Sequence, residues 1–515
     1  MENKKTKIIS IVAIVALALT VITATYAYFQ AQVGDPASAD IKVNANTVDT
    51  FTFSNGSAIS FSINQDNFAS GKGNQTGSTY ASATLTANNK TNTATEHYYL
   101  YLNIENNTFT YSINESIPEI IMTVTDSSGT EVTDISTLNH VIVTGANGTQ
   151  VSGYDITNKS GLITLFNNRE ITTTSSKEEK WNITITFVNH DENQNANAGK
   201  SMSAKVMIQK EQLLFSYVIS QYTGTQGENS IYYHDSSLAN GAGDNSYRYS
   251  GASESVNNFV CFGTNTTPCP TDNLYRIIGV FGDKVKLIKY DYANSNLLGT
   301  DGDYSTDTYS KSYYETYKGE LTTINRYYWN YKNNTSINNG NGSNEWSTSL
   351  FNKINLNTNY LNKIGTTWSN LIEDTTWKVS GTTTYHVTPK EMYTAEITNA
   401  TKTYGPSDGV SKIGLMYASD YGFAADPSAW TLTMGSYNNT TATSTNWMRM
   451  GVTEWTITPY SLASSNVFFL NSTGNVGINL ANLGYGSRPV LYLKASVAYD
   501  GGSGTKDSPI TLVVW

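Results

Sequence analysis

The sequence predicts a mainly β protein, in which an antiparallel β-sandwich is followed by a mixed α+β, loop-rich domain. Short segments rich in aromatic and β-branched residues recur through the first half, separated by Asn, Gly and Asp clusters typical of turns. The second half adds segments with helical spacing. A chain of 515 residues is too long for one ordinary core. We expect a sandwich over 28–214, a linker over 215–245 and the α+β domain over 246–515.

The first half contains five predicted strands, at 98–104, 119–124, 140–143, 181–187 and 203–208. The fourth alternates strictly between apolar and polar residues. Because successive side chains of a strand point to opposite faces, Trp181, Ile183 and Ile185 are expected on one buried face. This strand therefore predicts a sheet with one side against a core.

The second half contains three further strand signals and two helix signals. A hairpin is predicted from 275–280 and 284–290, and its later strand alternates Val285 and Leu287 with Lys284 and Lys286. Another hairpin is expected over 467–478 and a last strand over 489–493. Helical spacing from Trp346 to Ile354 predicts one helix. The run 388–391 offers an N-cap, a first-turn proline and a capping-box carboxylate for another.

A basic stretch at residues 4–7 precedes an apolar segment, and no charged residue occurs again until Asp35. Such a segment can enter a bilayer while the lysines stay on the cytoplasmic side. We therefore expect the rest of the chain to lie outside the cell, secreted or at the cell surface.

Two interpretations of residues 1–27 are open, a signal peptide or a membrane anchor. Thr25 and Ala27 place small residues at the positions that signal peptidase inspects, which favours cleavage after Ala27. Without cleavage, the uncharged stretch 8–33 could span a hydrocarbon core of about 30 Å. The membrane would then be a permanent partner of the protein.

The composition excludes one class of partner. The net charge is −10 and only 14% of the residues are charged. Nucleic-acid binding requires a basic face that neutralises phosphates, so we expect no nucleic-acid partner. The 36 tyrosines and nine tryptophans either fill sheet cores or stack on ligands.

The chain has two cysteines, Cys261 and Cys269. In an oxidising compartment, two such close cysteines are expected to form one disulfide. No second cysteine pair and no nearby histidine completes a zinc site. A catalytic thiol also lacks support, because the nearest histidine is His234 and no nucleophile signature surrounds it.

The junction 25–29, Thr-Tyr-Ala-Tyr-Phe, followed at once by the strand-rich region, resembles the TasA/camelysin group of secreted Gram-positive proteins. The resemblance covers about residues 1–210. It implies a jelly-roll-like sandwich, release by a dedicated signal peptidase and, as in some members, self-assembly into fibres by strand exchange. The chain departs from the group in carrying a second large region.

Four segments of the second region, 275–281, 414–422, 455–460 and 484–490, resemble a repeated, functionally uncharacterised module of bacterial surface proteins. The ending Gly486-Ser487-Arg488-Pro489-Val490 is also similar to the last strand of C-type-lectin-like domains of the formylglycine-generating-enzyme kind. This similarity implies a mixed α+β fold. The copper-binding cysteine pair of that enzyme is not matched here, so its chemistry is not implied.

One segment offers oxygen ligands at the alternating positions of a calcium loop. These residues are Asp301, Asp303, Ser305 and Asp307. Thr306 and Ser312 stand where such a loop has Gly and Glu, so a solvated turn is the alternative. We expect no cofactor other than this calcium candidate.

No paired nucleophile and base emerges, because the five histidines are scattered. Our first hypothesis is therefore a non-enzymatic bacterial surface or secreted protein, an adhesin or an envelope or matrix component. A carbohydrate-binding module displayed on a β-sandwich stalk is the alternative, and an extracellular hydrolase the third possibility. A glycan or a protein on a cell surface would be the partner in the first two cases.

The carbohydrate hypothesis names candidate ligand-binding residues. Trp430, Trp447 and Trp455 are expected as stacking platforms. Arg488 could bind a carboxylate through both arms of its guanidinium, or form a structural ion pair that closes the last strand.

Overall fold

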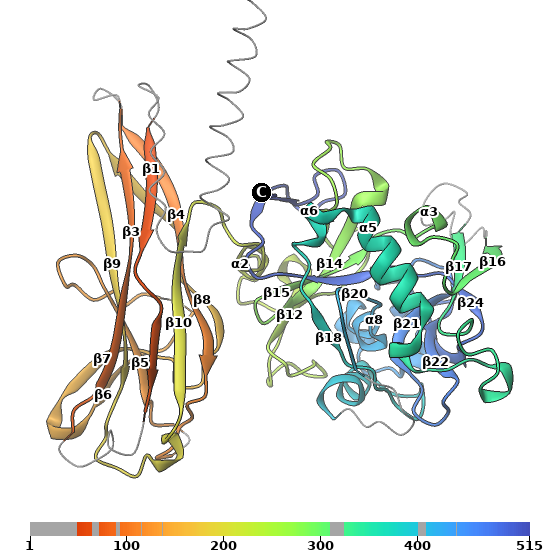
Figure 1. Ribbon diagram of the computed structural model, residues 1–515, viewed down its shortest axis with the longest axis horizontal. Coiled ribbons are helices and arrows are strands. Elements are labelled where there is room, and N and C mark those ends of the chain that lie inside the picture. The colour runs from red at the N-terminus through yellow and green to blue at the C-terminus, as the bar shows by residue number, and fades with distance from the viewer. Residues whose placement is uncertain are drawn as a thin grey trace, which may run out of the picture. The chain divides into compact units, whose positions relative to one another are not determined.

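The computed structural model describes residues 49–63, 72–88, 93–114, 116–135, 137–309, 324–399, 408–438 and 440–514. They form two compact units, one ending at Gln212 and the other running from Leu213 to Val514 (Figure 1). Within these ranges no helix is both long and apolar enough to cross a membrane. The expected signal peptide or anchor, 1–27, lies outside the described residues.

The first unit is an antiparallel β-sandwich of a six-stranded and a four-stranded sheet (Figure 1, red to yellow). In order across the larger sheet the strands are β1 (Thr50–Asn55), β3 (Gln75–Thr86), β9 (Ser176–Phe187), β5 (Ile120–Thr125), β7 (Gln150–Asp155) and β6 (His140–Thr144). The smaller sheet has the order β2 (Ile59–Ser62), β10 (Ser201–Gln209), β4 (Ala94–Asn107) and β8 (Gly161–Thr173). Short 3-10 turns lie at η2 (Ala146–Gly148) and η3 (Asn195–Asn197).

The core of the sandwich lies between the two sheets. Trp181, Ile183 and Ile185 of β9 are buried in it, as the alternating pattern predicted, together with Leu100 and Leu102 of β4. Burying a large aliphatic side chain contributes about 1.5–3 kcal/mol. The inward faces of these strands therefore hold the first unit together.

The second unit is built on a seven-stranded antiparallel sheet (Figure 1, green to blue). Its strands follow the order β11 (Ile231–His234), β12 (Ser246–Tyr249), β14 (Leu274–Phe281), β15 (Lys284–Lys289), β25 (Val490–Leu493) and β20 (Ile413–Gly414), with β13 (Phe259–Cys261) also paired to β14. One three-stranded sheet contains β16 (Tyr304–Tyr309), β17 (Ile324–Tyr328) and β24 (Gly484–Tyr485). A second three-stranded sheet contains β21 (Glu454–Pro459), β22 (Asn466–Leu470) and β23 (Val476–Leu480). The pairs β18 (Thr375–Trp377), β19 (Gly409–Ser411) and β26 (Tyr499–Gly501), β27 (Thr511–Leu512) complete the sheets of the described residues.

Helices of the second unit are short. The α-helices are α2 (Leu214–Ser220), α3 (Ser295–Leu298), α5 (Leu361–Ile364), α6 (Thr366–Ser369), α7 (Pro389–Tyr393), α8 (Ala418–Ala424) and α9 (Thr440–Ser444). Two π-helical segments are η8 (Phe351–Tyr360), which continues into α5, and η9 (Thr394–Thr398), which follows α7. The 3-10 turns are η4 (Glu228–Ser230), η5 (Thr271–Asn273), η6 (Asn338–Gly340), η7 (Trp346–Thr348), η10 (Pro427–Ala429) and η11 (Met434–Ser436).

The predicted hairpins, the last strand and the helix at 388–391 are present with small shifts in their ends, whereas the helix predicted from Trp346 to Ile354 is a 3-10 turn, η7, followed by the π-helical η8. The first hairpin is β14 and β15, and the second is β22 and β23. Thr388 caps α7: its hydroxyl accepts from the Glu391 N–H, and the Glu391 carboxylate accepts from the Thr388 N–H, which is the expected capping box. The chain is thus mainly β with a mixed, loop-rich second part, as the sequence predicted.

The expected linker over 215–245 was wrong. Phe215 and Val218 of α2 are buried, and the Leu214 N–H donates to the carbonyl of Val497. Further along, β11 pairs with β12 as the edge strand of the seven-stranded sheet. The apolar residues of this segment bury their side chains in the second unit, which a linker cannot do.

Candidate functional site

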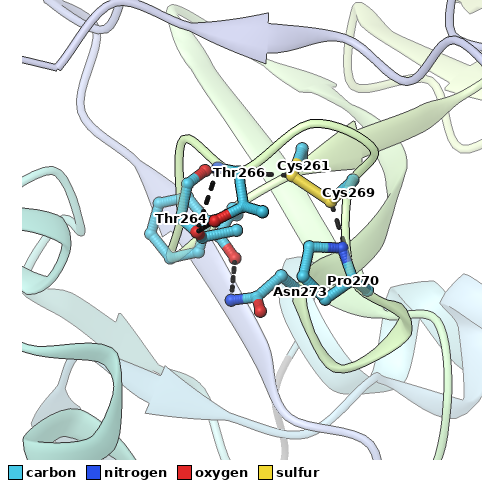
Figure 2. The surroundings of a disulfide bond; sticks show 7 residues. Cys261, Thr264, Thr266, Cys269, Pro270 and Asn273 are labelled. Atoms are coloured by element: carbon cyan, nitrogen blue, oxygen red, sulfur yellow. Dashed lines mark hydrogen bonds between the residues drawn. A yellow bond between two sulfur atoms is a disulfide. The ribbon is translucent and has the colours of Figure 1, made fainter.

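The disulfide between Cys261 and Cys269 is formed (Figure 2). It closes the loop between β13 and β14. Within that loop Asn273 Nδ2 donates to the Phe262 carbonyl at 3.1 Å, and the Phe262 N–H donates to the Asn273 carbonyl at 2.9 Å. These bonds hold the base of the loop in register beside the disulfide.

The three tryptophans expected as exposed stacking platforms are instead core residues. Trp430, Trp447 and Trp455 are at most 1% exposed. Each indole N–H donates to a main-chain carbonyl, at 2.7–2.9 Å. A ligand cannot reach their ring faces, so the prediction that they bind a sugar was wrong. Composition alone does not distinguish a buried tryptophan with a paired N–H from an exposed one.

Arg488 forms a structural ion pair. Its guanidinium contacts the Glu454 carboxylate through two hydrogen bonds of 2.8 Å, and both side chains are 1% exposed. Burial lowers the pKa of Arg488, but the charge of Glu454 outweighs it and the net shift is upward. Both guanidinium arms are occupied within the fold, which favours the structural alternative over a ligand carboxylate.

The calcium-loop residues hold the fold around them. The buried Asp303 carboxylate accepts from the N–H groups of Lys332 at 2.7 Å and Phe351 at 3.1 Å. Asp301 accepts from Asn359 Nδ2 at 2.6 Å, and Ser305 is buried. The side chain of Asp307 lies outside the described residues. Within the described ranges no group of three or more His, Cys, Asp or Glu is placed to hold a metal.

A polar cleft of about 700 Å³ lies beside this segment. Its lining residues are Ser295, Asn296, Leu297, Gly299, Thr300, Asp301, Asn359, Asn362 and Lys363. Asn359 Nδ2 bridges the Leu298 carbonyl and Asp301, so part of its polar surface is already used internally. The lining offers amides and hydroxyls but no aromatic ring.

A cluster of buried charges occupies one face of the seven-stranded sheet. Across four strands, Arg248, Gly279, Lys286 and Tyr492 are neighbours in register. A Cβ on Gly279 would lie 3.3 Å from Arg248 Cγ and 2.3 Å from the Tyr247 carbonyl. Glycine at this position therefore leaves room for the Tyr247 carbonyl and the Arg248 side chain.

Lys286 pairs with Asp420, which lies in the first turn of α8. Nζ lies 2.5 Å from Oδ2, and the side chains are 1% and 2% exposed. The Tyr417 N–H donates to the same oxygen at 2.9 Å. Burial lowers the pKa of the Lys286 ammonium, but the charge of Asp420 outweighs it and the net shift is upward.

Arg248 completes this cluster through a second acid. Its Nη2 lies 2.6 Å from Asp244 Oδ2, and its Nη1 lies 3.9 Å from Asp420 Oδ1. Burial alone would raise the pKa of Asp244, but the charge of Arg248 outweighs burial and the pKa is lowered to about 2. The four charges balance, so the cluster as a whole is neutral.

Glu396 is a buried carboxyl beside the start of α8. It accepts from the Ala418 N–H at 3.0 Å and from the Thr458 hydroxyl at 2.5 Å. Burial raises its pKa to about 7. The carboxyl is thus poised to change its charge near neutral pH while it fixes the turn that carries Asp420.

No sequence pattern predicted this cluster. Lys286 alternates with Val285 and Leu287 in β15, and such a pattern normally places the lysine in solvent. It is instead covered by α8, and Asp420 is remote in the sequence.

Three tyrosines gather on the edge of the seven-stranded sheet. Tyr233 of β11 and Tyr247 of β12 are cross-strand partners with stacked rings 4.6 Å apart, and the ring of Tyr222 lies 5.5 Å from that of Tyr247. All three are partly exposed. The amide of the exposed Gln226 pairs with both the N–H and the carbonyl of Tyr233, which satisfies the strand edge. We call these three residues the tyrosine cluster.

Comparisons with models of protein families and with curated proteins found no match to this chain.

Proposed function

We propose that this chain is an exported, non-enzymatic protein of the bacterial cell surface or extracellular matrix, an adhesin or an envelope component. The observation that carries the proposal is the Cys261–Cys269 disulfide, which uses both cysteines of the chain. Such bonds form and persist in oxidising compartments outside the cytoplasm. The basic and apolar start of the chain agrees with export.

The distribution of charge supports a role in display rather than catalysis. The buried charged side chains of two pairs, Lys286 with Asp420 and Arg488 with Glu454, have partners within the fold. With 14% charged residues, the chain depends on neutral polar side chains for its solubility. In this proposal the sandwich acts as a stalk or assembly unit and the second unit as the displayed head.

Surface accessibility in the cells that make the protein tests the proposal. Protease is added to intact cells, and the chain is followed with antibodies against each unit. The expected result is digestion of the chain while a cytoplasmic marker stays intact. A chain that is protected until the cells are lysed would contradict export.

Carbohydrate binding is the second candidate function, and the tyrosine cluster is the observation that favours it. Aromatic faces stack on the apolar faces of sugar rings, and nearby amides satisfy hydroxyls. Tyr233 and Tyr247 are partly exposed and offer such faces. This surface replaces the buried tryptophans as the place where a sugar would stack.

A glycan array with the full chain tests this candidate. If the cluster binds sugar, Tyr233→Ala loses the signal, because a stacking face is removed. Tyr331→Ala is the matched control, since Tyr331 is a partly exposed tyrosine beyond β17 whose ring lies 5.1 Å from that of Tyr328. Absence of binding by the wild type, or equal loss in both variants, would reject the tyrosine cluster as a sugar site.

A further inference from the structure

The pair of Lys286 and Asp420 has the geometry of a reactive pair as well as of an ion pair. An amine and a carboxyl group lie 2.5 Å apart, N to O, and both side chains are buried, at 1% and 2% exposed. Lys286 is on an interior strand of the seven-stranded sheet, and Asp420 is in the first turn of α8. Fixing two reactants in contact replaces an encounter in solution with a step inside one molecule.

Water is excluded from the pair by aromatic rings. The Lys286 ammonium lies 4.6 Å from the ring centre of Tyr417, 5.2 Å from that of Tyr492 and 5.5 Å from that of Phe281. An environment without water disfavours hydrolysis of an amide and makes two buried charges costly. Formation of an amide would remove both charges from this environment.

The remaining charges stay balanced if this pair is neutralised. Arg248 keeps its own acid, Asp244, at 2.6 Å. Without Lys286 and Asp420 as ions, the cluster still contains one cation and one anion in contact. The loss of the two charges therefore leaves no unpaired ion behind.

We propose that Lys286 and Asp420 condense after folding into an intramolecular isopeptide bond between Nζ of the lysine and Cγ of the aspartate. The ammonium first passes one proton to the carboxylate, which gives a neutral amine and a neutral acid. The amine lone pair then attacks Cγ, the nitrogen loses a second proton, and one carboxyl oxygen leaves as water. The ion pair thus becomes one amide and one water molecule, with no oxidant, reductant or co-reactant.

The surroundings of Asp420 suit the tetrahedral intermediate of this step. The Tyr417 N–H donates to Oδ2 at 2.9 Å, and Arg248 Nη1 lies 3.9 Å from Oδ1. The hydrogen bond from Tyr417 and the nearby positive charge of Arg248 stabilise the negative charge that develops on oxygen when an amine adds to a carboxyl carbon. Glu396 acts as a positioning residue, because it holds the Ala418 and Ser419 N–H groups of the same turn.

Mass spectrometry of the full-length wild-type chain tests the bond. The intact mass is expected to be lower by one water molecule than the mass calculated for the disulfide-bonded chain. Trypsin is then expected to spare Lys286 and to release residues 285–289 joined to residues 413–449. The joined peptides locate the link, because dehydration at an Asp-Gly sequence would give the same mass without joining them.

Two controls separate reaction from simple pairing. Lys284 and Glu373 form a similar contact, 2.7 Å, but are 38% and 27% exposed, and their peptides are expected to stay separate. Lys286→Arg keeps the positive charge but removes the nucleophilic amine, so this variant is expected to have the full calculated mass. If the variant does not fold, the wild-type map alone decides.

The tryptic peptides of the wild type distinguish the two outcomes. Joined peptides with the bond at Lys286 and Asp420 support the proposal. Complete recovery of the separate peptides from folded wild-type protein overturns it, as does a link from Lys286 to any other carboxyl group.

Discussion

Arg488 and Glu454 form a buried ion pair with two parallel contacts, Nε to Oε2 and Nη2 to Oε1, each 2.8 Å long. Glu454 begins β21, and Arg488 lies two residues before β25. Arg488 Nη2 also donates to the Met448 carbonyl at 2.6 Å. The pair therefore ties the seven-stranded sheet to the three-stranded sheet of β21, β22 and β23.

Loss of one charge of this pair is expected to destabilise the second unit strongly. Glu454→Gln leaves the Arg488 guanidinium buried without a counter-charge, at a cost of about 3–5 kcal/mol in the free energy of unfolding. Urea denaturation followed by tryptophan fluorescence measures this loss. Glu373→Gln is the control, because its pair with Lys284 is partly exposed and is expected to contribute about 0–1 kcal/mol. Equal small losses in both variants would contradict a structural role for Arg488.

The stability of the second unit is expected to depend on pH through Glu396. Burial raises the pKa of this carboxyl from 4.5 to about 7 in the folded state. Between these pH values the folded protein holds a proton that the unfolded chain has released. The contribution of Glu396 to the free energy of unfolding therefore falls as pH rises. The decrease amounts to about 3 kcal/mol, from the size of the pKa shift.

Glu396→Gln is expected to remove that contribution, because glutamine keeps the shape and stays neutral. The measurement is the difference in unfolding free energy between wild type and variant at about pH 5 and about pH 8. Relative to the variant, the wild type is expected to be less stable at the higher pH than at the lower pH. The same pH dependence in both proteins would show that Glu396 titrates normally in the fold.

A buried carboxylate with no cationic partner among the described residues organises the loops of the sandwich. Glu119 accepts from Ser112 Oγ at 2.7 Å, from Gln194 Nε2 at 2.7 Å and from Asn197 Nδ2 at 2.8 Å. Glu119→Ala leaves these donors unsatisfied and is expected to cost at least about 3 kcal/mol. Thermal unfolding followed by circular dichroism measures the loss. Glu178→Ala is the control, because Glu178 is an exposed residue on β9. The stability of this variant is expected to lie within about 0.5 kcal/mol of that of the wild type. Similar midpoints for the two variants would refute the role of Glu119.

The disulfide is expected to stabilise the second unit by about 2–3 kcal/mol in the chain-entropy model, given its short loop. The double variant Cys261→Ser/Cys269→Ser is compared with the wild type by urea denaturation. The reduced wild type serves as a control with unchanged sequence, and its midpoint is expected to match that of the variant. A variant as stable as the oxidised wild type would mean that the hydrogen bonds of Asn273 alone hold the loop.

Sequence patterns predicted those parts of the fold that depend on neighbouring residues. Alternation placed Trp181 and Ile183 in the sandwich core, and the capping box placed the start of α7 at Thr388. Two cysteines in one short segment predicted the disulfide. Each of these features is specified within a few residues of the chain.

The candidate site depended on contacts between distant segments, which local patterns do not encode. Lys286 and Asp420 meet because α8 covers the sheet, and the indole N–H of the buried Trp447 donates to the carbonyl of Tyr249, which is remote in the sequence. The segment 215–245 looked like a linker because its turns are polar, although β11 inside it completes a sheet edge. The residue types of these segments therefore do not show which side chains will be buried.

The most direct test of export is the intact mass of the native protein, purified from the cells that make it and from their medium. A thiol-alkylating reagent is added before the protein is denatured. We expect recovery outside the cytoplasm, a mature chain that begins at Tyr28 and no alkylation of Cys261 or Cys269. An anchored chain would keep Met1 in the membrane fraction and still carry the disulfide. Recovery of the chain from the cytoplasm with both thiols alkylated would contradict the proposal that this is an exported surface protein.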